Sequence, residues 1–433
     1  MSPSAPRRGP GPGARPAARP PAARLPERGA AVSPARRAAW TVVRRVLEQD
    51  AYADRALMTE AEGLEPRDRA LAKQLAFGAV QRRGTLDWVI ARLAPGKKLE
   101  PPVRAALHLG IYEQLFLGTA DHASVDQAVE LAKPSYGYKL VNAVLRRLQR
   151  EGIELPGDET IAGAAVRHSH PQWLVTLWWK ELGADATRAL LAADNEPAEL
   201  ALRINTLADV DEAALPPGRR EGDALVVEGP FDVAGSPLFR AGVITPQSRA
   251  AQMVAPFLDP QPGERVLDLC AAPGGKTTHL AALMRAEGEV VAVERHPGRA
   301  RALTAACRRM HATNVTVVQA DARTFTSGRP FDRVLVDPPC SGLGTLRTHP
   351  DLRWKVTPDA IAGLVVVQDR ILAAAQAALA PGGTLVYATC TISAAEDRLA
   401  SEDRFRTLPH VDGTDGFSVA RVTGATRSGQ PAA

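Results

Sequence analysis

Apolar residues recur at helical spacing through the first third of the chain. Val103, Leu107 and Ile111 lie four residues apart, and the apolar positions between residues 140 and 148 form a second stripe of the same kind. Such spacing gathers apolar side chains on one face of a helix, and strand-like alternation does not interrupt it. We therefore predict an all-α bundle over residues 35–152.

A mixed pattern follows over residues 153–250. An aromatic helical stretch begins near His170, and the run from Leu200 to Asn205 has the length and composition of a strand. Short strands and glycine-containing turns come next. These features predict a small α+β domain that links the bundle to the rest of the chain.

Residues 251–424 alternate between strand-like runs and helical segments. Alternation of this kind predicts a Rossmann-like α/β domain, in which helices cover both faces of a parallel sheet. Ligands of such sheets bind at the carboxyl ends of the strands, so functional residues are expected there. The strand-like runs occupy residues 265–269, 290–294, 315–319, 333–337 and 384–389.

Composition and charge add predictions about the two ends of the sequence. Residues 1–34 are basic and rich in proline and arginine, and neither they nor residues 425–433 carry enough large apolar side chains to build a core. We predict that both are disordered tails. The formal charge of +5 equals the net charge of residues 1–34 alone, and the rest of the chain has 47 basic and 47 acidic residues. A basic surface elsewhere therefore requires spatial segregation of charge.

The four cysteines show no C-x-x-C spacing, which argues against a metal site or a disulfide scaffold. Reduced thiols are typical of the cytoplasm. The first residues lack a continuous apolar segment, and no run approaches the roughly 18 apolar residues of a membrane span. We predict a cytoplasmic protein without a membrane or metal partner.

The first motif with chemical content is D-L-C-A-A-P-G-G-K-T-T-H at 268–279, between a predicted strand and a predicted helix. Gly274 and Gly275 permit close approach of the backbone to a ligand, and the helix N-terminus favours a carboxylate. The G-x-G-x-x-G spacing of dinucleotide sites is absent. S-adenosylmethionine, which has a carboxylate and a ribose, suits the loop better. Glu294 and Asp321 end the next two strands, where they could bind the ribose hydroxyls and the adenine amino group.

Two thiols follow later strands, Cys340 in Asp337-Pro338-Pro339-Cys340 and Cys390 in Thr-Cys-Thr. Carbon 5 of cytosine is a poor nucleophile, but a thiolate that adds to carbon 6 activates it toward a sulfonium methyl group. Asp337 could stabilise charge at N3 during this addition. Chemistry alone does not tell which cysteine attacks.

These motifs, with D-G-T-D-G-F at 412–417, resemble the RsmB/Sun-type (NOL/NOP/Sun) RNA cytosine-C5 methyltransferases, which act on 16S ribosomal RNA in bacteria. The helical region resembles the NusB-like RNA-binding domain of such enzymes. The resemblance implies that Cys390 is the nucleophile and that Cys340 assists product release. It also implies that S-adenosylmethionine contacts Cys270, Ala271, Ala272, Pro273, Gly274, Gly275, Lys276, Glu294, Asp321 and Asp337.

The resemblance implies RNA as the partner of a protein that we expect to be a monomer. Arg203 and Asn205, polar residues on a predicted strand, are candidates for RNA contact, as are Arg146 and Arg147 on the last helix of the bundle. A solvated helix face carries such arginines just as often.

The chain departs from the family pattern after the nucleophile. Glu396-Asp397-Arg398 stands where Glu-Asn-Glu is usual, the segment from there to Phe405 is short, and Ser418 replaces an aromatic residue. We expect a truncated helix after the fifth strand and weaker packing behind Cys390.

Two alternatives stay open, and a third, a DNA cytosine-C5 enzyme, is disfavoured by the Thr-Cys-Thr motif and the NusB-like region. DNA cytosine-C5 enzymes carry the nucleophile in their Pro-Cys motif, which would make Cys340 the attacking thiol. A transfer RNA could replace ribosomal RNA as the substrate. A non-catalytic RNA-binding or assembly factor could keep a vestigial methyltransferase fold.

Overall fold

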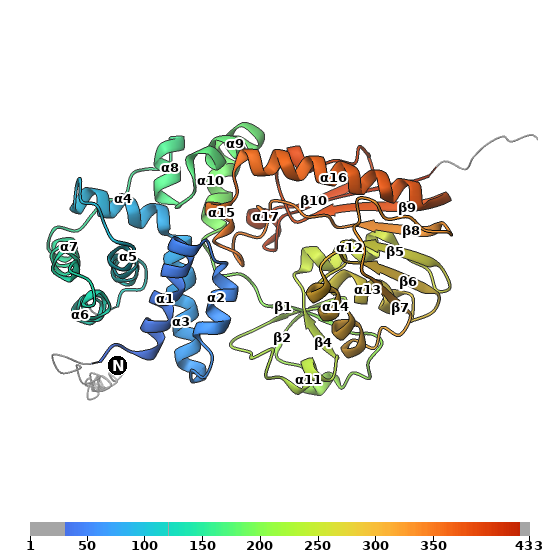
Figure 1. Ribbon diagram of the computed structural model, residues 1–433, viewed down its shortest axis with the longest axis horizontal. Coiled ribbons are helices and arrows are strands. Elements are labelled where there is room, and N and C mark those ends of the chain that lie inside the picture. The colour runs from blue at the N-terminus through green and yellow to red at the C-terminus, as the bar shows by residue number, and fades with distance from the viewer. Residues whose placement is uncertain (1–30, 120, 425–433) are drawn as a thin grey trace, which may run out of the picture.

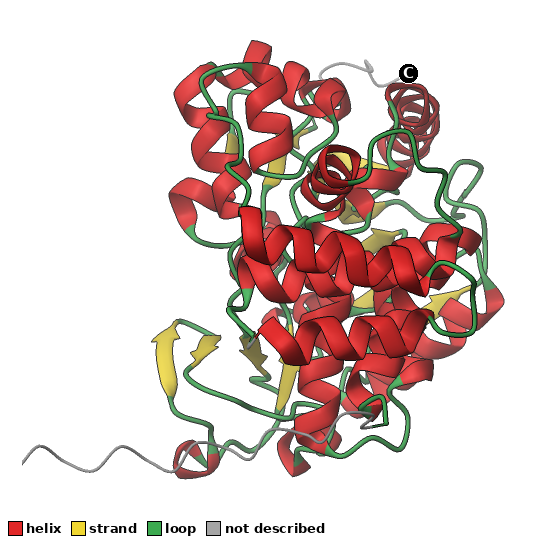
Figure 2. Cartoon of the chain, turned by 90° about the vertical axis from the view of Figure 1, so that its left-hand side faces the viewer, coloured by secondary structure: helices red, strands yellow, loops and turns green. Residues whose placement is uncertain are grey.

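The structure, a computed structural model, describes residues 31–119 and 121–424. The tails predicted at 1–34 and 425–433 therefore lie almost wholly outside the described residues. An all-helical region, a small sheet and a larger α/β region follow one another along the chain (Figure 1). Seen from the side of the helical region, helices face the viewer and most strands lie behind them (Figure 2).

The N-terminal region is an all-α bundle, as predicted, and its apolar stripes form one core that includes Val103, Leu107 and Ile111. Ser33 caps the first helix by accepting a hydrogen bond from the Arg36 N–H, and proline occupies the first turn there. The helices are α1 (Pro34–Gln49), α2 (Ala53–Glu60), α3 (Pro66–Gln81), α4 (Arg83–Leu93), α5 (Pro101–Phe116), α6 (Asp121–Ala132) and α7 (Tyr138–Glu151).

The middle region has two parts that pack in different places. Three helices come first, α8 (Ile161–Arg167), α9 (Gln172–Leu182) and α10 (Ala184–Ala193). An antiparallel sheet of order β2-β3-β1-β4 follows and has a small core of its own. Its elements are β1 (Ala201–Ile204), η1 (Glu212–Ala214), β2 (Gly218–Glu221), β3 (Ala224–Val227), α11 (Pro237–Arg240) and β4 (Ile244–Pro246).

The C-terminal region is built on a seven-stranded sheet of order β10-β11-β9-β8-β5-β6-β7. Its strands are β5 (Arg265–Leu269), β6 (Glu289–Val293), β7 (Val315–Val318), β8 (Phe331–Val336), β9 (Leu379–Thr389), β10 (Arg404–Thr407) and β11 (Phe417–Thr423). Helices α12 (Arg249–Leu258), α13 (Gly275–Leu283) and α14 (Pro297–Arg309) cover one face, and α16 (Pro358–Ala378) covers the other. Three short elements complete the region, α15 (Leu352–Lys355), η2 (Ala394–Glu396) and α17 (Pro409–Asp412).

Two differences from the sequence predictions concern this sheet. The five predicted strands pair in parallel, but β10 and β11 add an antiparallel edge that the pattern did not indicate. The border expected at residue 250 falls inside α12, because Ser248 caps a helix that begins at Arg249. Between β9 and β10 the chain forms only one short turn, η2, so the shortened helix expected after the fifth strand stays a prediction about the family pattern.

Helix α16 corrects the expectation about apolar length. Among the described residues it alone is long and apolar enough to cross a membrane. Its Ile371, Leu372 and Ala375 pack in the core that covers strands β8 and β9. The apolar character of α16 thus follows from its position on the sheet. The length and composition of a single helix are weak evidence for a membrane span.

The segment after β8 connects all three regions. Leu343 and Leu346 share a core with Trp178 of α9, and Arg353 is fully buried where it donates to the carbonyl oxygens of Ser169 and Asp194. The Trp354 indole N–H donates to the Val80 carbonyl oxygen of the bundle at 2.7 Å. The chain therefore runs directly from the carboxyl end of β8 into contacts with the N-terminal helices.

Candidate active site

A cavity of about 460 Å³ opens at the carboxyl ends of the parallel strands. Its volume lies in the range of roughly 300–1,000 Å³ that is usual for small-molecule sites. The sequence motifs meet here, since the lining includes Cys270, Ala272, Glu294, Asp321, Asp337, Cys340 and Cys390. Side chains separated by up to 120 positions in the sequence therefore face one space, as strand order predicts.

The loop after β5 brings backbone to the cavity. Gly274 precedes the first residue of α13 with φ 106°, and a Cβ there would lie 2.8 Å from Leu303 Cδ1. Only glycine fits this conformation and this approach. Cys270 lines the cavity, but burial raises the pKa of its thiol to about 12, with further contributions from Asp337, Asp268 and Glu294. A protonated thiol in this place is not a nucleophile.

Carboxylates follow the next strands and already have partners. Glu294 is nearly buried and accepts a hydrogen bond from the His296 N–H at 2.8 Å. The Asp321 carboxylate pairs with the Arg323 guanidinium, which lowers the pKa of Asp321 to about 2. The Asp321 carboxylate is therefore ionised near neutral pH, and both side chains offer acceptor oxygens beside the cavity.

Asp337 and Lys276 form the charged pair nearest to the thiols. Lys276 Nζ lies 2.7 Å from Asp337 Oδ2. Burial lowers the pKa of Lys276, but the charge and hydrogen bond of Asp337 outweigh it, and the net pKa is raised, with a contribution from Cys390. The ammonium group therefore stays charged where it can stabilise a thiolate.

The two thiols predicted from the motifs lie side by side. The Sγ atoms of Cys340 and Cys390 are 3.4 Å apart, and both side chains are half-buried. The hydrogen bond to Cys390 and burial raise the pKa of Cys340 well above its usual range. Two sulfur atoms this close do not ionise together, so the pair holds at most one thiolate with one thiol beside it.

The residues at the cavity fit S-adenosylmethionine. Glu294, directly after β6, is a carboxylate that can accept hydrogen bonds from ribose hydroxyls. The backbone N–H groups of the first turn of α13 lie next to the close approach at Gly274 and can bind a carboxylate.

Sequence reasoning missed how the loops are held. The Gly344 N–H donates to the Cys390 carbonyl oxygen at 3.0 Å, and the Gly344 carbonyl oxygen accepts from the Gly416 N–H at 2.8 Å. A Cβ at Gly344 would lie 1.9 Å from the Gly416 oxygen, so glycine is required there. The D-G-T-D-G-F motif therefore supports the Cys390 loop from behind, a role that the motif alone did not indicate.

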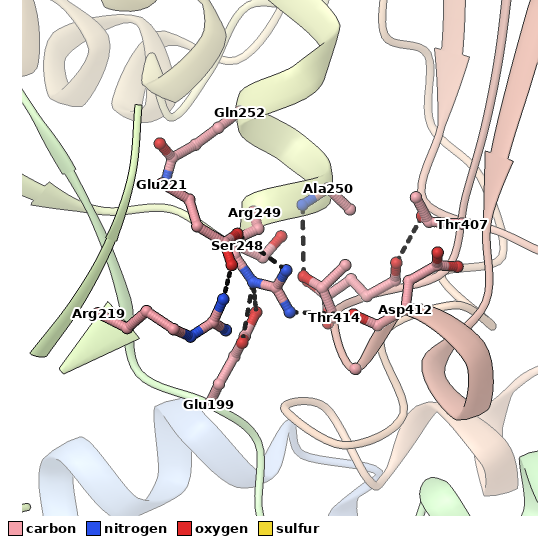
Figure 3. A network of polar contacts seen from close by, with 12 residues as sticks. Glu199, Arg219, Glu221, Ser248, Arg249, Ala250, Gln252, Thr407, Asp412 and Thr414 are labelled. Atoms are coloured by element: carbon pink, nitrogen blue, oxygen red, sulfur yellow. Dashed lines mark hydrogen bonds and ion pairs between the residues drawn. The ribbon is translucent and has the colours of Figure 1, made fainter. Parts of the chain in front are cut away.

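Arg249 fixes this motif to the middle sheet (Figure 3). Its guanidinium donates to the Glu199 carboxylate at 3.0 Å, to Glu221 at 3.1 Å and to the Asp412 carbonyl oxygen at 3.0 Å. The Thr414 hydroxyl accepts from the Ala250 N–H at 3.3 Å. The start of α12 thus joins strand β2 to the loop that supports Cys390.

Two of the candidates for RNA contact are wrong. Arg203 and Asn205 are fully buried. Arg203 donates to Gln247 and Thr278, and Asn205 donates to the carbonyl oxygens of Gly242 and Met310. Their hydrogen bonds join the end of β1 to α13 and to the end of α14. These two polar side chains therefore hold the small sheet against the C-terminal region.

Arg146 and Arg147 are partly exposed on α7, and neither lines the cavity. Arg147 pairs with Glu151 at 2.8 Å, and Arg146 lies 3.8 Å from Asp126. Contact between these two arginines and RNA stays a prediction.

A glycine loop after the first parallel strand, a carboxylate after the second and paired thiols after the fourth and fifth define a methyltransferase that uses S-adenosylmethionine. Comparison with known proteins agrees. Residues 255–414 match the family of the 16S rRNA methyltransferase RsmB/F, residues 33–150 match the NusB family, and residues 170–215 match the ferredoxin-like domain of RsmF/B-like methyltransferases.

Relatives match most of the chain. A probable ribosomal RNA small subunit methyltransferase B from Synechocystis is 37% identical over 403 residues, which covers 86% of this chain and 88% of the relative. A ribosomal RNA small subunit methyltransferase B from Vibrio cholerae is 36% identical over 386 residues, with 84% and 87% covered. The chain belongs to the RsmB/F family of methyltransferases.

Solved structures share the fold. The crystal structure of PH0851 matches with a TM-score of 0.74 at 26% identity and covers 90% of this chain and 99% of that one. The structure of a methyltransferase homologue from Pyrococcus horikoshii matches with a TM-score of 0.54 at 25% identity, covering 61% and 98%.

Proposed function

We propose that the protein methylates carbon 5 of a cytosine in 16S ribosomal RNA and that Cys390 forms the covalent adduct. The observation that carries the proposal is the pair of thiols, 3.4 Å apart, in the cavity that holds the cofactor-binding residues. Relatives named ribosomal RNA small subunit methyltransferase B support the RNA target. We further propose that the protein acts as a monomer in the cytoplasm.

The reaction needs a nucleophile, a charge stabiliser and a base. The Cys390 thiolate adds to carbon 6 of cytosine, which forms a C–S bond and moves the electron pair of the C5–C6 bond to carbon 5. When bound, S-adenosylmethionine would supply a methyl group on its sulfonium sulfur; carbon 5 takes this group as the methyl–sulfur bond breaks and the sulfur keeps the electron pair. A base then removes the proton from carbon 5, the C5–C6 double bond reforms, and Cys390 leaves as a thiolate.

The neighbouring groups suit these steps. Lys276 places a positive charge near Cys390 that favours the thiolate, and it orients the Asp337 carboxyl group toward the cavity. A proton shared between the Asp337 carboxyl group and N3 of the cytosine can offset the negative charge that develops at N3 as the thiolate adds. Cys340 lies beside Cys390 and can exchange a proton with the departing sulfur, because hydrogen-bond contact between the two is already present.

The roles of the thiols predict opposite results for two variants. Cys390→Ala should abolish methyl transfer and form no covalent RNA complex. Cys340→Ala should still attack carbon 6 but release product slowly, so a protein–RNA adduct should accumulate. Denaturing electrophoresis with radiolabelled small-subunit RNA and S-adenosylmethionine measures both outcomes.

Cys307→Ala is the matched control, because that thiol is buried in α14 outside the cavity. It should methylate as the wild-type protein does, without adduct. An adduct that accumulates in Cys390→Ala, and not in Cys340→Ala, would assign the nucleophile to Cys340. If calorimetry shows that the wild-type protein does not bind S-adenosylmethionine, a vestigial methyltransferase fold is favoured instead.

Bisulfite sequencing of RNA from a deletion strain tests the substrate. Loss of one modified cytosine in 16S ribosomal RNA is expected, and its return requires the wild-type protein. A site lost from transfer RNA alone would redirect the proposal to that substrate.

A further inference from the structure

Glu396 is a fully buried carboxylate close to both thiols, and the reaction steps above do not use it. It ends the short turn η2, six residues after Cys390. Its Oε1 accepts hydrogen bonds from the Ser341 N–H at 2.9 Å and from Gln368 Nε2 at 3.0 Å. Its Oε2 accepts from the Ser341 hydroxyl and from the Thr391 hydroxyl, the latter at 3.1 Å. Donors thus surround both oxygens.

The donors come from the two loops that carry the thiols. Ser341 directly follows Cys340, and Thr391 directly follows Cys390. Their hydroxyl groups also contact each other at 2.8 Å. The Gln368 amide, held on α16, donates to the Pro339 carbonyl oxygen at 3.0 Å as well as to Glu396. One carboxylate therefore joins the loop after β8, the loop after β9 and the covering helix.

The position of Glu396 is itself fixed. The Tyr387 hydroxyl in β9 donates to the Glu396 carbonyl oxygen at 3.2 Å, which holds the turn against the sheet. A buried carboxylate without partners would cost several kcal/mol, so four donors in this place offset a large desolvation penalty. Loss of the carboxylate would leave the Ser341 N–H and two hydroxyl groups without their acceptor in a closed space.

We propose that Glu396 is a positioning residue that sets the separation between the Cys340 and Cys390 thiols. The proposal rests on the proposed roles of these thiols in adduct formation and release. Proton exchange between two sulfur atoms needs them in contact, and misplacement of a reacting group by about 1 Å can cost roughly 100-fold in rate. Glu396 achieves this by bonding to the neighbours of the two cysteines, without touching the substrate.

Disulfide formation measures the thiol separation without RNA or cofactor. A diazene oxidant such as diamide takes two hydrogen atoms from a pair of thiols, becomes a hydrazine and leaves an S–S bond. Wild-type protein should form the Cys340–Cys390 disulfide rapidly, because its sulfur atoms are already 3.4 Å apart. Glu396→Ala should lose this rapid phase, as followed by peptide mapping after alkylation of the remaining thiols.

Steady-state methylation gives the second measurement. Glu396→Ala should lower kcat by about 100-fold through misplaced thiols while the Kd for S-adenosylmethionine stays unchanged. In Glu396→Gln the side-chain oxygen still accepts hydrogen bonds, and the amide NH2 can donate to the two hydroxyl groups. This variant should therefore keep most of the wild-type activity and the rapid disulfide formation. Asp397→Ala is the matched control, since the neighbouring carboxylate pairs with Arg404 and contacts neither loop.

The outcomes separate the two proposals. Rapid disulfide formation in Glu396→Ala, at the wild-type rate, would overturn the positioning role whatever the methylation result. Equal losses in Glu396→Gln and Glu396→Ala, with thermal midpoints like that of the wild type, would also overturn it, because charge and not bonding would then matter. A wild-type protein that forms the disulfide but methylates no RNA contradicts the proposed function and leaves the positioning test intact.

Discussion

Asp194 is a carboxyl group that folding encloses completely. It is fully buried at the end of α10, and neither carboxylate oxygen has a hydrogen-bond partner among the described residues. Burial raises the pKa of Asp194 to about 7, against the lowering effect of Arg353. The nearby His170 has its pKa lowered well below the usual range, mainly by burial. At mildly acid pH the His170 and Asp194 side chains, 3.4 Å apart, are therefore both neutral.

Burial of Asp194 makes its own contribution to stability fall as pH rises, whereas burial of His170 in its neutral form makes a contribution that rises with pH up to about 6.5. The unfolded carboxyl releases its proton near pH 4, but the folded one holds it to about pH 7. Unfolding therefore releases a proton between these values, and the free energy of unfolding declines with pH by up to about 1.4 kcal/mol per unit from this group. Asp194→Asn removes the Asp194 contribution alone, so the change in melting temperature from pH 5 to pH 8 should be more positive in this variant than in the wild type.

Asp185→Asn provides the comparison, because that carboxylate lies exposed on the same helix. Its melting temperature should keep the wild-type dependence on pH. If calorimetry shows that Asp194→Asn also keeps the wild-type dependence of melting temperature on pH, then Asp194 is ionised in the folded protein between pH 5 and pH 8.

Among the elements, the start of α13 makes the sharpest demand on the sequence. Gly274→Ala puts a side chain at φ 106° and 2.8 Å from Leu303 Cδ1. Backbone strain of this kind costs about 1–3 kcal/mol, and a shift of the loop that relieves it would move the N–H groups that we propose bind the cofactor. We expect the Kd for S-adenosylmethionine to rise about tenfold or more in calorimetry.

Gly363→Ala is the opposite case, since a Cβ there meets no atom within 4 Å on α16. It should leave cofactor affinity unchanged and stabilise the helix by up to about 1 kcal/mol. Equal affinity in the Gly274 and Gly363 variants would mean that the loop tolerates a side chain.

The elements also mark how far sequence alone reaches. Helical spacing identified the bundle, and strand-like runs identified the five parallel strands, because both patterns arise from burial that each segment achieves locally. The pattern did not indicate β10, in which two of four residues are arginine, or the seven-residue β11. Motif chemistry brought both thiols and the acidic residues to one cavity.

Contacts between distant segments were not predictable in the same way. Arg203 looks like a surface arginine in sequence, but its partners Gln247 and Thr278 are 44 and 75 residues away. Glu396 appeared only as part of a departure from the family pattern, and its four donors come from three separate segments. The space that a polar side chain occupies depends on packing between domains, which no local pattern encodes.

At the scale of the whole molecule, one stretch of the chain is basic although residues 35–433 sum to zero charge. Residues 295–320 contain no acidic residue, and this stretch includes α14 and the cavity-lining Arg295 and Arg299. Arg301 and Arg308 are exposed two turns apart on α14, and within the described ranges neither has an ion-pair partner. Arg301 and Arg308 therefore define an exposed basic face on the helix that also carries the cavity-lining Arg299.

This face predicts a measurable share of RNA affinity. Arg301→Ala with Arg308→Ala should weaken binding of small-subunit RNA, because each phosphate contact contributes about 0.7–0.9 to the slope of log affinity against log salt. The slope should become shallower in filter-binding assays across a salt series. Arg44→Ala with Arg188→Ala removes the same charge from arginines already paired with Glu48 and Asp185. If both double variants lose the same slope, then overall charge, and not the α14 face, governs binding.

The strand order has a consequence for how the enzyme is made. Strand β11 lies between β9 and β10, so residues 417–423 fill an interior place in the sheet. A ribosome that has delivered everything up to residue 416 has delivered every residue of the cavity, yet β9 still lacks a neighbour on one side. The N-terminal bundle, in contrast, has its whole core in the first 150 residues and can fold during translation. Nascent chains should therefore fold the N-terminal helices early and gain catalytic competence only after residues 417–423 have been made.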